Sequence, residues 1–440
     1  MMIAADQQNK KPAKRVVLLQ MNEALMPLIK GYATSASLPN WQRLFRENEL
    51  VEFTSETEDK YLEPWIQWVS FYTRKPFKKH QIFHLNDYKK PDADDLFVSL
   101  KAKGKKIGLF CAMSHPGLAG LDVYIPDPWS KNTSDPSITS RAMDKLCKYF
   151  VLQNTRVPNP FPVLISFLIL FFSIKGLKKY SVILRSCQAL LSKDRVRLSA
   201  FFDLFLLMFA ASQHQNKQLD FSAIFINGLA HIQHHYLLSS SRLEGQNPDW
   251  YVAPDTDPIL KALHIYDEGL AWLYSQNLDF VTVTGLSQKT LEQPVFYWRL
   301  RSHQQLLEKI INDDFVCNPK MSRDFDLEFQ DEASAERAMA ILKACMISDM
   351  NGAQSAFGHF DRRGKNLFCS LIYSGNGQAA ILQHPAGKIP ISKEINFVAI
   401  KNSIHDSKGW MLLPRNQKPD HFPANLKCWQ LGTYIEKCIP

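Results

Sequence analysis

The chain has 440 residues, of which 45% are hydrophobic, so it can bury a large core and is not a disordered protein. Its formal net charge is +9, but the basic clusters are short and are not interleaved with aromatic residues, which argues against nucleic-acid binding. The eight cysteines lack CxxC spacing, and the first fifteen residues lack the apolar stretch of a secretory signal peptide. We therefore expect a cytoplasmic protein with reduced thiols.

Short apolar, β-branched runs predict six buried strands. They lie at residues 16–21, 107–111, 221–226, 280–284, 368–373 and 397–400. Segments with helical spacing lie between them, for example at residues 38–45, 259–273 and 332–347. Strands that alternate with helices predict an α/β fold with a largely parallel central sheet and helices on both faces.

The alternation is interrupted by a mostly helical stretch. We predict that residues 1–140 and 216–440 are two parts of one α/β domain, and that residues 141–215 are a helical insertion or cap. Within this stretch, residues 161–174 are apolar but fall short of the roughly 20 residues that a membrane-spanning helix needs. Two interpretations stay open for residues 161–211: core helices, or peripheral contact with an anionic membrane.

Three histidines follow the third predicted strand, in the segment AHIQHHY at residues 230–236. If this segment is helical, His231 shares a face with both His234 and His235. Two imidazoles on one face can bind zinc or a similar divalent ion. Because residues that follow parallel strands gather at one edge of the sheet, we expect His405, after the last predicted strand, to be a further ligand.

Other polar residues are candidates for binding an anionic substrate. Gln67 and Gln288 could donate hydrogen bonds to a phosphoryl oxygen, or merely complete hydrogen bonds at the edge of the site. Arg74 could pair with a phosphate or form a surface ion pair. Three further arginines could bind an anion or serve a structural role: Arg299, Arg301 and Arg323.

Taken together, these segments resemble the alkaline phosphatase superfamily, in particular its nucleotide pyrophosphatase and phosphodiesterase branch. In that family the first strand ends in a metal-binding aspartate, and here VVLLQM is followed by Asn22 and Glu23. A serine or threonine nucleophile precedes a Thr-Gly pair by three residues, and a histidine follows. Ser70, Thr73-Arg74 and His80 have this spacing, with arginine in place of glycine. The resemblance implies that Ser70 is the nucleophile, that His80 lies at the substrate, and that Asn22 and Glu23 are metal ligands.

The chain departs from the family pattern at the metal site. The family has aspartate and histidine four residues apart, and AHIQHHY offers either Ala230 with His234 or His231 with His235. The family motif Asp-His-Gly is replaced by Gly285-Leu286, which supplies no ligand. A histidine near the C-terminus of the family corresponds to His405. The resemblance thus implies an incomplete two-metal site that could hold one ion, zinc or alternatively manganese.

These residues favour a metal-dependent hydrolase or transferase that acts on a phosphate or sulfate ester of a small molecule or glycan. The alternative is a catalytically impaired pseudoenzyme that serves as a binding or assembly factor, for example in envelope polysaccharide synthesis. The loss of the Asp-His pair at Gly285-Leu286 favours the alternative, whereas the histidine cluster favours the enzyme.

Overall fold

The computed structural model describes residues 15–439 except 86, 153–160, 175, 177, 321–322, 351, 376, 378 and 418–421. Internal contacts divide the described chain into two compact units. Unit 1 lies within Met1–Tyr149, Asn159–Thr290 and Ser403–Pro440, and unit 2 is formed chiefly by Leu291–Asn402. This division differs from the prediction that residues 216–440 form one continuous part of the α/β domain. The reason is that Leu291–Asn402 has an apolar core of its own, around residues such as Phe325 and Leu367.

Unit 1 is built on a seven-stranded sheet in the order β2-β17-β6-β1-β5-β3-β4. Strands β6, β1, β5, β3 and β4 run parallel, and β17 is antiparallel to both β6 and β2. The largely parallel central sheet expected from the sequence is therefore confirmed. The strands are β1 (Val16–Met21), β2 (Asn48–Thr54), β3 (Ile107–Phe110), β4 (Val123–Ile125), β5 (Phe221–Ile226), β6 (Asp279–Val283) and β17 (Lys408–Pro414).

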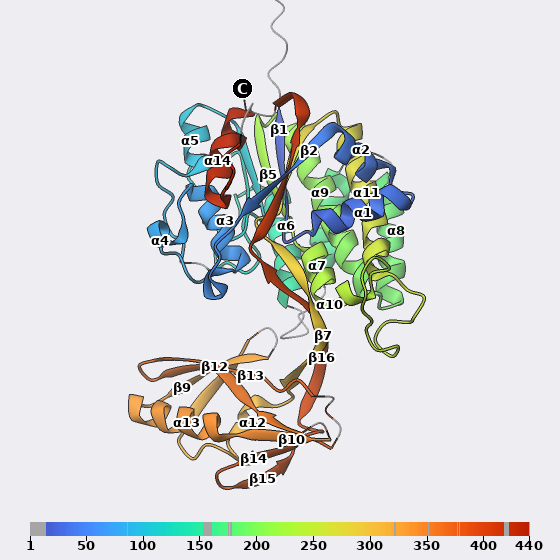
Figure 1. Cartoon of the computed structure of the whole chain (residues 1–440). Helices are drawn as coiled ribbons and strands as arrows, with labels where there is room; N and C mark the ends of the chain where they lie inside the picture. The colour runs from blue at the N-terminus through green and yellow to red at the C-terminus, as the bar shows by residue number, and fades with distance from the viewer. Residues whose placement is uncertain are drawn as a thin grey trace, which may run out of the picture. The chain divides into compact units, whose positions relative to one another are not determined.

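Helices cover both faces of this sheet, as expected (Figure 1). One layer contains α3 (Pro64–Thr73), α5 (Leu96–Ala102) and α14 (Cys428–Lys437), and the other contains α1 (Met26–Ser35), α2 (Pro39–Glu47), α9 (Arg195–Asn216) and α11 (Pro258–Ser275). Every residue of β1 and of β5 is buried, because a strand between two helical layers has no solvent-facing side. This explains why the continuous apolar runs predicted these strands.

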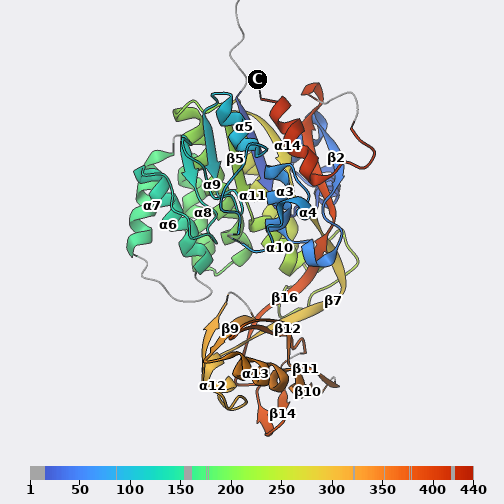
Figure 2. The same ribbon diagram turned by 90° about the vertical axis from the view of Figure 1, so that its left-hand side faces the viewer.

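Four helices span residues 138–216, namely α6 (Ile138–Leu152), α7 (Phe161–Ser173), α8 (Lys178–Leu191) and α9. Figure 2 shows α6, α7 and α8 on the outer side of α9, which packs on β5 and α11. Among the described helices, α9 is long and apolar enough to cross a membrane. However, 78% of its most apolar stretch is buried in the protein, so we interpret α9 as a core helix.

Unit 2 contains two four-stranded sheets, β11-β10-β14-β15 and β12-β13-β9-β8, with two helices. Its elements are α12 (His303–Leu307), β8 (Phe315–Pro319), β9 (Asp324–Phe329), α13 (Glu332–Ala344), β10 (Met346–Asp349), β11 (Gly352–Ser355), β12 (Phe357–Arg363), β13 (Asn366–Leu371), β14 (Ile381–His384) and β15 (Gly387–Pro390). Strands β7 (Ser287–Leu300) and β16 (Ile395–Asp406) pair with each other and carry the chain into this unit and back.

Two of the six predicted strands therefore lie outside the central sheet. The run at 368–373 overlaps β13 of unit 2, and the run at 397–400 lies within β16. His405 consequently belongs to the end of β16 and does not follow the last strand of the sheet. That last strand is β17, which starts only two residues after β16 ends.

Candidate metal site

The candidate site lies at the carboxyl ends of β1, β5 and β6, where the chain leaves the sheet. The Asn22 N–H donates to the Ile226 carbonyl at the end of β5, and the Glu23 N–H donates to the Thr284 carbonyl after β6. Glu23 has a φ of 54°, a left-handed conformation that turns the chain away from β1. These bonds fix Glu23 between the ends of β5 and β6, the two strands that flank β1, and its side chain is almost fully buried.

Helix α10 (Gly228–Tyr236) begins directly after β5 and carries the histidine cluster. The Asp203 carboxylate of α9 accepts hydrogen bonds from the Gly228 N–H at 2.7 Å and from the Tyr266 hydroxyl at 2.6 Å. Burial raises the pKa of Asp203 to about 6, although these hydrogen bonds oppose the rise. At its other end α10 is tied to the β1 loop, because the Gln233 amide donates to the Glu23 carbonyl at 2.8 Å. This bond holds Gln233, and with it the following residue His234, close to the β1 loop.

Glu23, His234 and His405 converge on one point. The Nε2 atoms of His234 and His405 lie 2.8 Å and 3.4 Å from Glu23 Oε2. One potential ligand atom from each residue lies within 4.8 Å of the other two, and the described part of the chain contains no second group of this kind. Burial raises the pKa of the Glu23 carboxyl, but the two imidazoles outweigh this effect and hold it well below its usual value.

The hydrogen bonds behind these residues determine which ring nitrogens carry protons. His405 Nδ1 lies 2.8 Å from the Leu62 carbonyl, which can only accept, so this nitrogen carries the proton. The Gln288 amide nitrogen donates to Glu23 Oε2 at 2.6 Å, which fixes the amide orientation and points Oε1 at the Ser403 hydroxyl.

Ser403 donates to Gln288 Oε1 at 2.6 Å and can therefore accept a hydrogen bond from the Nδ1–H of His234, 3.3 Å away. When both imidazoles are neutral, each directs the lone pair of Nε2 at the Glu23 carboxylate, whereas the protonated rings lower the pKa of Glu23 through their charge. In the neutral state, the two Nε2 atoms and the Glu23 carboxylate face one another, and each of them can only accept a hydrogen bond. This arrangement requires a cation between them, either an added proton or a metal ion.

Two imidazoles with one carboxylate form a recognised ligand set of catalytic zinc sites, in which three protein ligands leave a further position open. The fixed Nδ1–H groups of both histidines provide the outer contacts that orient such ligands. The described residues therefore fit one divalent ion.

Asn22, which the resemblance implies as a ligand, has its amide already engaged. Its Nδ2 donates to Glu23 Oε1 at 2.8 Å and to Asn227 at 2.7 Å, and its Oδ1 accepts from the Trp68 indole at 2.9 Å. Trp68 also fills the space beside Gly285, where a Cβ would come within 2.9 Å of the indole ring. Gly285 has a φ of 74°, so neither the space nor the backbone there suits a ligand side chain.

Ser70, on α3, and His80, at the end of α4 (Phe77–His80), are brought together, and neither belongs to the group of Glu23, His234 and His405. Ser70 is completely buried, and its hydroxyl lies 2.9 Å from His80 Nε2. His80 Nδ1 accepts from the Ile82 N–H at 3.0 Å, so in the neutral ring Nε2 carries the proton and donates to Ser70. Burial, together with the charge of Lys75, lowers the pKa of His80 to about 4 and keeps it neutral at pH 7. In this arrangement His80 is not placed to accept the Ser70 proton.

The remaining predicted residues have other contacts. Gln67 accepts from the Glu56 N–H and donates to the Tyr61 carbonyl. Arg74 forms an ion pair with Glu436 at 2.7 Å. His231 and His235 contact each other, with ring centroids 4.6 Å apart, and neither belongs to the ligand group of His234.

Sequence reasoning missed Ser403, Asn227, Leu62 and Glu63. Ser403 precedes His405 by two residues on one strand, so both side chains point to the same face, a signal that was available. Leu62 acts through its carbonyl, which no sequence pattern reveals. Glu63 Oε2 lies 3.6 Å from His405 Nδ1, at the start of α3.

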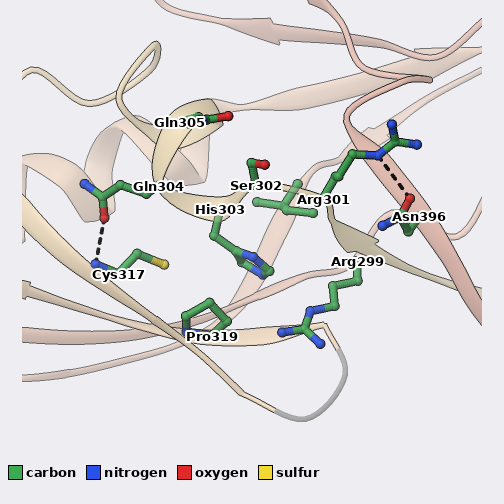
Figure 3. Close-up of a pocket in the computed structure, with 10 residues that line it drawn as sticks. Arg299, Arg301, Ser302, His303, Gln304, Gln305, Cys317, Pro319 and Asn396 are labelled. Carbon is green, nitrogen blue, oxygen red and sulfur yellow. Dashed lines mark hydrogen bonds between the residues drawn. The ribbon is translucent and has the colours of Figure 1, made fainter. Parts of the chain in front are cut away.

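A separate pocket of about 510 Å³ lies in unit 2 and is shown in Figure 3. Arg299, Arg301, His303 and Asn396 are among its lining residues, and Arg301 donates to Asn396 at 3.2 Å. Arg323 does not line it; its guanidinium lies over the Tyr297 ring, 4.2 Å from the centroid. The pocket contains none of the three candidate metal ligands.

No known family and no curated protein matches the sequence. Among solved structures, the chain is similar to phosphonoacetate hydrolase from Sinorhizobium meliloti in complex with phosphonoformate, at 12% identity and a TM-score of 0.42, with 97% of this chain and 96% of that chain covered. It is also similar to murine ectonucleotide pyrophosphatase/phosphodiesterase 5, at 9% identity and a TM-score of 0.38, with 96% and 94% covered.

A third similar structure is the alkaline phosphatase PafA, at 9% identity and a TM-score of 0.43, with 98% of this chain and 96% of that chain covered. At such values no residue role transfers, and the site residues are assigned from the geometry of this chain alone.

Proposed function

We propose that the protein is a hydrolase of phosphate or sulfate esters that depends on one divalent metal ion held by Glu23, His234 and His405. The observation that carries this proposal is the convergence of two imidazole Nε2 atoms on Glu23 Oε2, at 2.8 Å and 3.4 Å. Zinc suits this ligand set best, with manganese as the alternative. An ion bound there would supply Lewis acidity toward an ester oxygen and would lower the pKa of a water molecule.

The protein's own groups have distinct tasks in this proposal. Gln288 and Asn22 donate to the two oxygens of Glu23 and so hold the carboxylate in place. Leu62 and Ser403 orient the two imidazoles through their Nδ1 atoms. Glu63 Oε2 lies 3.6 Å from His405 Nδ1, the ring nitrogen that does not face Glu23, so in this proposal Glu63 helps to orient that imidazole.

The sequence predicts Ser70 as the nucleophile, and a water molecule is the other candidate. Ser70 lies seven residues after Glu63, which is about 10 Å along the axis of α3, and its hydroxyl accepts from His80. A hydroxyl without a base or a metal beside it is a poor nucleophile. The geometry therefore favours water.

Metal analysis and ester hydrolysis test the proposal together. Purified protein is expected to bind about one zinc ion, and Glu23→Gln and His405→Ala are each expected to abolish stoichiometric binding. Hydrolysis should be assayed on aryl phosphates, phosphodiesters and sulfates, before and after chelation and after metal is added back. His384→Ala serves as a control, because this histidine lies in unit 2. Turnover that survives complete metal removal would overturn the proposal.

The pseudoenzyme alternative also has a supporting observation. Trp68 occupies the space beside Gly285 and binds Asn22, so the half of the family site that would hold a second ion is filled by protein atoms. Stoichiometric metal binding without hydrolysis of any of these ester classes would favour a binding protein over an enzyme.

A further inference from the structure

Helix α7 exposes a large apolar surface. Leu164, Ile165, Leu168 and Phe172 are all exposed, and Phe172 exposes 76% of its surface. Consecutive members of this set are one, three and four residues apart in the sequence, which places all four on one side of the helix. On the opposite side, Leu170 is fully buried. The helix is therefore apolar both where it packs on the protein and where it faces outward.

Helix α8 repeats this arrangement. Tyr180, Leu184, Cys187 and Leu191 are exposed and are spaced by four, three and four residues, which is one continuous stripe. Leu184 and Leu191 expose 61% and 85% of their surfaces. Val182 and Ala189 are buried on the inner side. An ordinary surface helix carries polar residues on its outer face, so this stripe is unusual for a helix that faces water.

The two helices concentrate exposed apolar residues. Fifteen large apolar side chains are exposed in the part of the chain that the structure describes, and seven of them lie on α7 and α8. Isolated exposed apolar residues are common, but a contiguous set of them indicates a surface that binds a membrane or another protein. We call this set of seven residues on α7 and α8 the apolar face.

The surrounding sequence is strongly basic. Residues 145–193 contain eight lysines and arginines and no aspartate or glutamate, so they account for +8 of the formal net charge of +9. Arg185 pairs with Glu268, and Lys148 pairs with Asp144. Three other lysines, Lys175, Lys178 and Lys179, fall in the sequence between the exposed residues of α7 and those of α8.

We propose that the apolar face docks on an anionic lipid bilayer. Its leucine and phenylalanine side chains would enter the boundary between headgroups and acyl chains, and the formal charge of +8 on residues 145–193 would attract this segment to anionic lipid. The helices have 13 and 14 residues, too few to span a bilayer, so they lie in the plane of the interface. Of the wider stretch 161–211, α9 takes no part, because it is buried in the core.

The charge distinguishes a lipid surface from a protein partner. A hydrophobic protein partner would need only the apolar face, whereas an anionic bilayer also uses a segment from which every acidic residue is missing. Docking on lipid does not depend on the proposed hydrolysis, since none of the candidate metal ligands lies on α7 or α8.

Sedimentation with vesicles tests this proposal on the full-length protein. The protein is expected to bind vesicles that contain about 30% phosphatidylglycerol and to bind pure phosphatidylcholine at least tenfold more weakly. Phe172→Glu with Leu184→Glu should lower binding to anionic vesicles by tenfold or more, since each buried side chain of this size contributes about that factor. Val316→Glu is the matched control, because Val316 is equally exposed but lies in unit 2.

A label on Cys187 gives a second, independent measurement. Cys187 is the one exposed cysteine in the described chain, so a polarity-sensitive fluorophore can be attached there after the partly buried Cys317 and Cys438 are changed to serine. Its emission should shift to the blue when anionic vesicles are added. Unchanged emission together with no sedimentation would overturn the proposal. A wild-type dimer that Phe172→Glu converts to a monomer, without vesicle binding, would instead assign the face to a second copy of the chain.

Circular dichroism and ester hydrolysis serve as controls for all variants. Folded variants that lose vesicle binding but retain metal binding would support lipid docking whether or not the protein proves to be a hydrolase.

Discussion

The Ser403 hydroxyl donates a hydrogen bond to Gln288 Oε1 at 2.6 Å, although the two residues are 115 positions apart in the sequence. Through this bond Ser403 presents its lone pairs to His234 Nδ1. The orientation of a metal ligand therefore depends on a residue that does not touch the metal position itself.

Replacing Ser403 by alanine is expected to weaken zinc binding by about 10-fold to 100-fold, because outer contacts of ligating histidines have effects of this size. Isothermal titration of the metal-free protein measures the change. Ser355→Ala, at an exposed position of unit 2, is the control. Equal affinities for Ser403→Ala and wild type would show that His234 keeps its orientation without the hydroxyl.

Ser70→Ala separates the two candidate nucleophiles. If water attacks, ester turnover should stay within about twofold of wild type, while the free energy of unfolding falls by about 1 to 3 kcal/mol because the buried His80 N–H loses its acceptor. Urea unfolding and steady-state kinetics measure the two effects. A loss of turnover by several orders of magnitude, with metal binding intact, would instead assign the nucleophile to Ser70.

Asn22→Asp tests the electrostatics beside Glu23. Asn22 donates to Glu23 Oε1 and to Asn227 Oδ1, so a carboxylate in its place would face two acceptors and a negative charge. We expect the free energy of unfolding of the metal-free variant to be about 1 to 3 kcal/mol lower than that of wild type, with a lower Tm. We also expect zinc to raise the Tm of the variant more than that of wild type. Asn425→Asp, at an exposed turn position, should behave like wild type in both states.

Asp203 should make stability depend on pH in a predictable direction. Its pKa is raised to about 6 in the folded protein, so the folded state binds this proton more tightly than the unfolded chain. The contribution of Asp203 to the free energy of unfolding therefore increases as the pH falls from about 6 toward 4. Tm values of wild type and Asp203→Asn across this range should diverge in favour of wild type at the acidic end. Parallel curves would mean that Asp203 has an ordinary pKa in the folded state.

The sequence predicted the parts of the fold that depend on burial on both faces. The strands at 16–21 and 221–226 were found with their boundaries, because a strand between two helical layers is apolar throughout. By contrast, β2 and β17 lie toward one edge of the sheet and have mixed burial patterns, which gave no clear signal. The separate core of unit 2 was missed because most of its strands, such as β9, alternate between buried and more exposed residues and give no continuous apolar run.

For the candidate site, the rule that ligands gather at strand ends led to Glu23 and to the segment that contains His234. It could not select His234 from three neighbouring histidines, since this depends on how α10 is held by Gln233 and Asp203. Nor could it place Ser70, because family spacing does not reveal how far along α3 a residue lies from the strand ends.

The three candidate ligands come from distant parts of the chain, and His405 follows the whole of unit 2 in the sequence. During synthesis on the ribosome, Glu23 and His234 would emerge long before their partner. A nascent chain therefore cannot bring the three side chains together until unit 2 has been made, so capture of the proposed metal ion would come late in biogenesis. Translation products that stop within unit 2 would have two of the three ligands and would hold the ion only weakly.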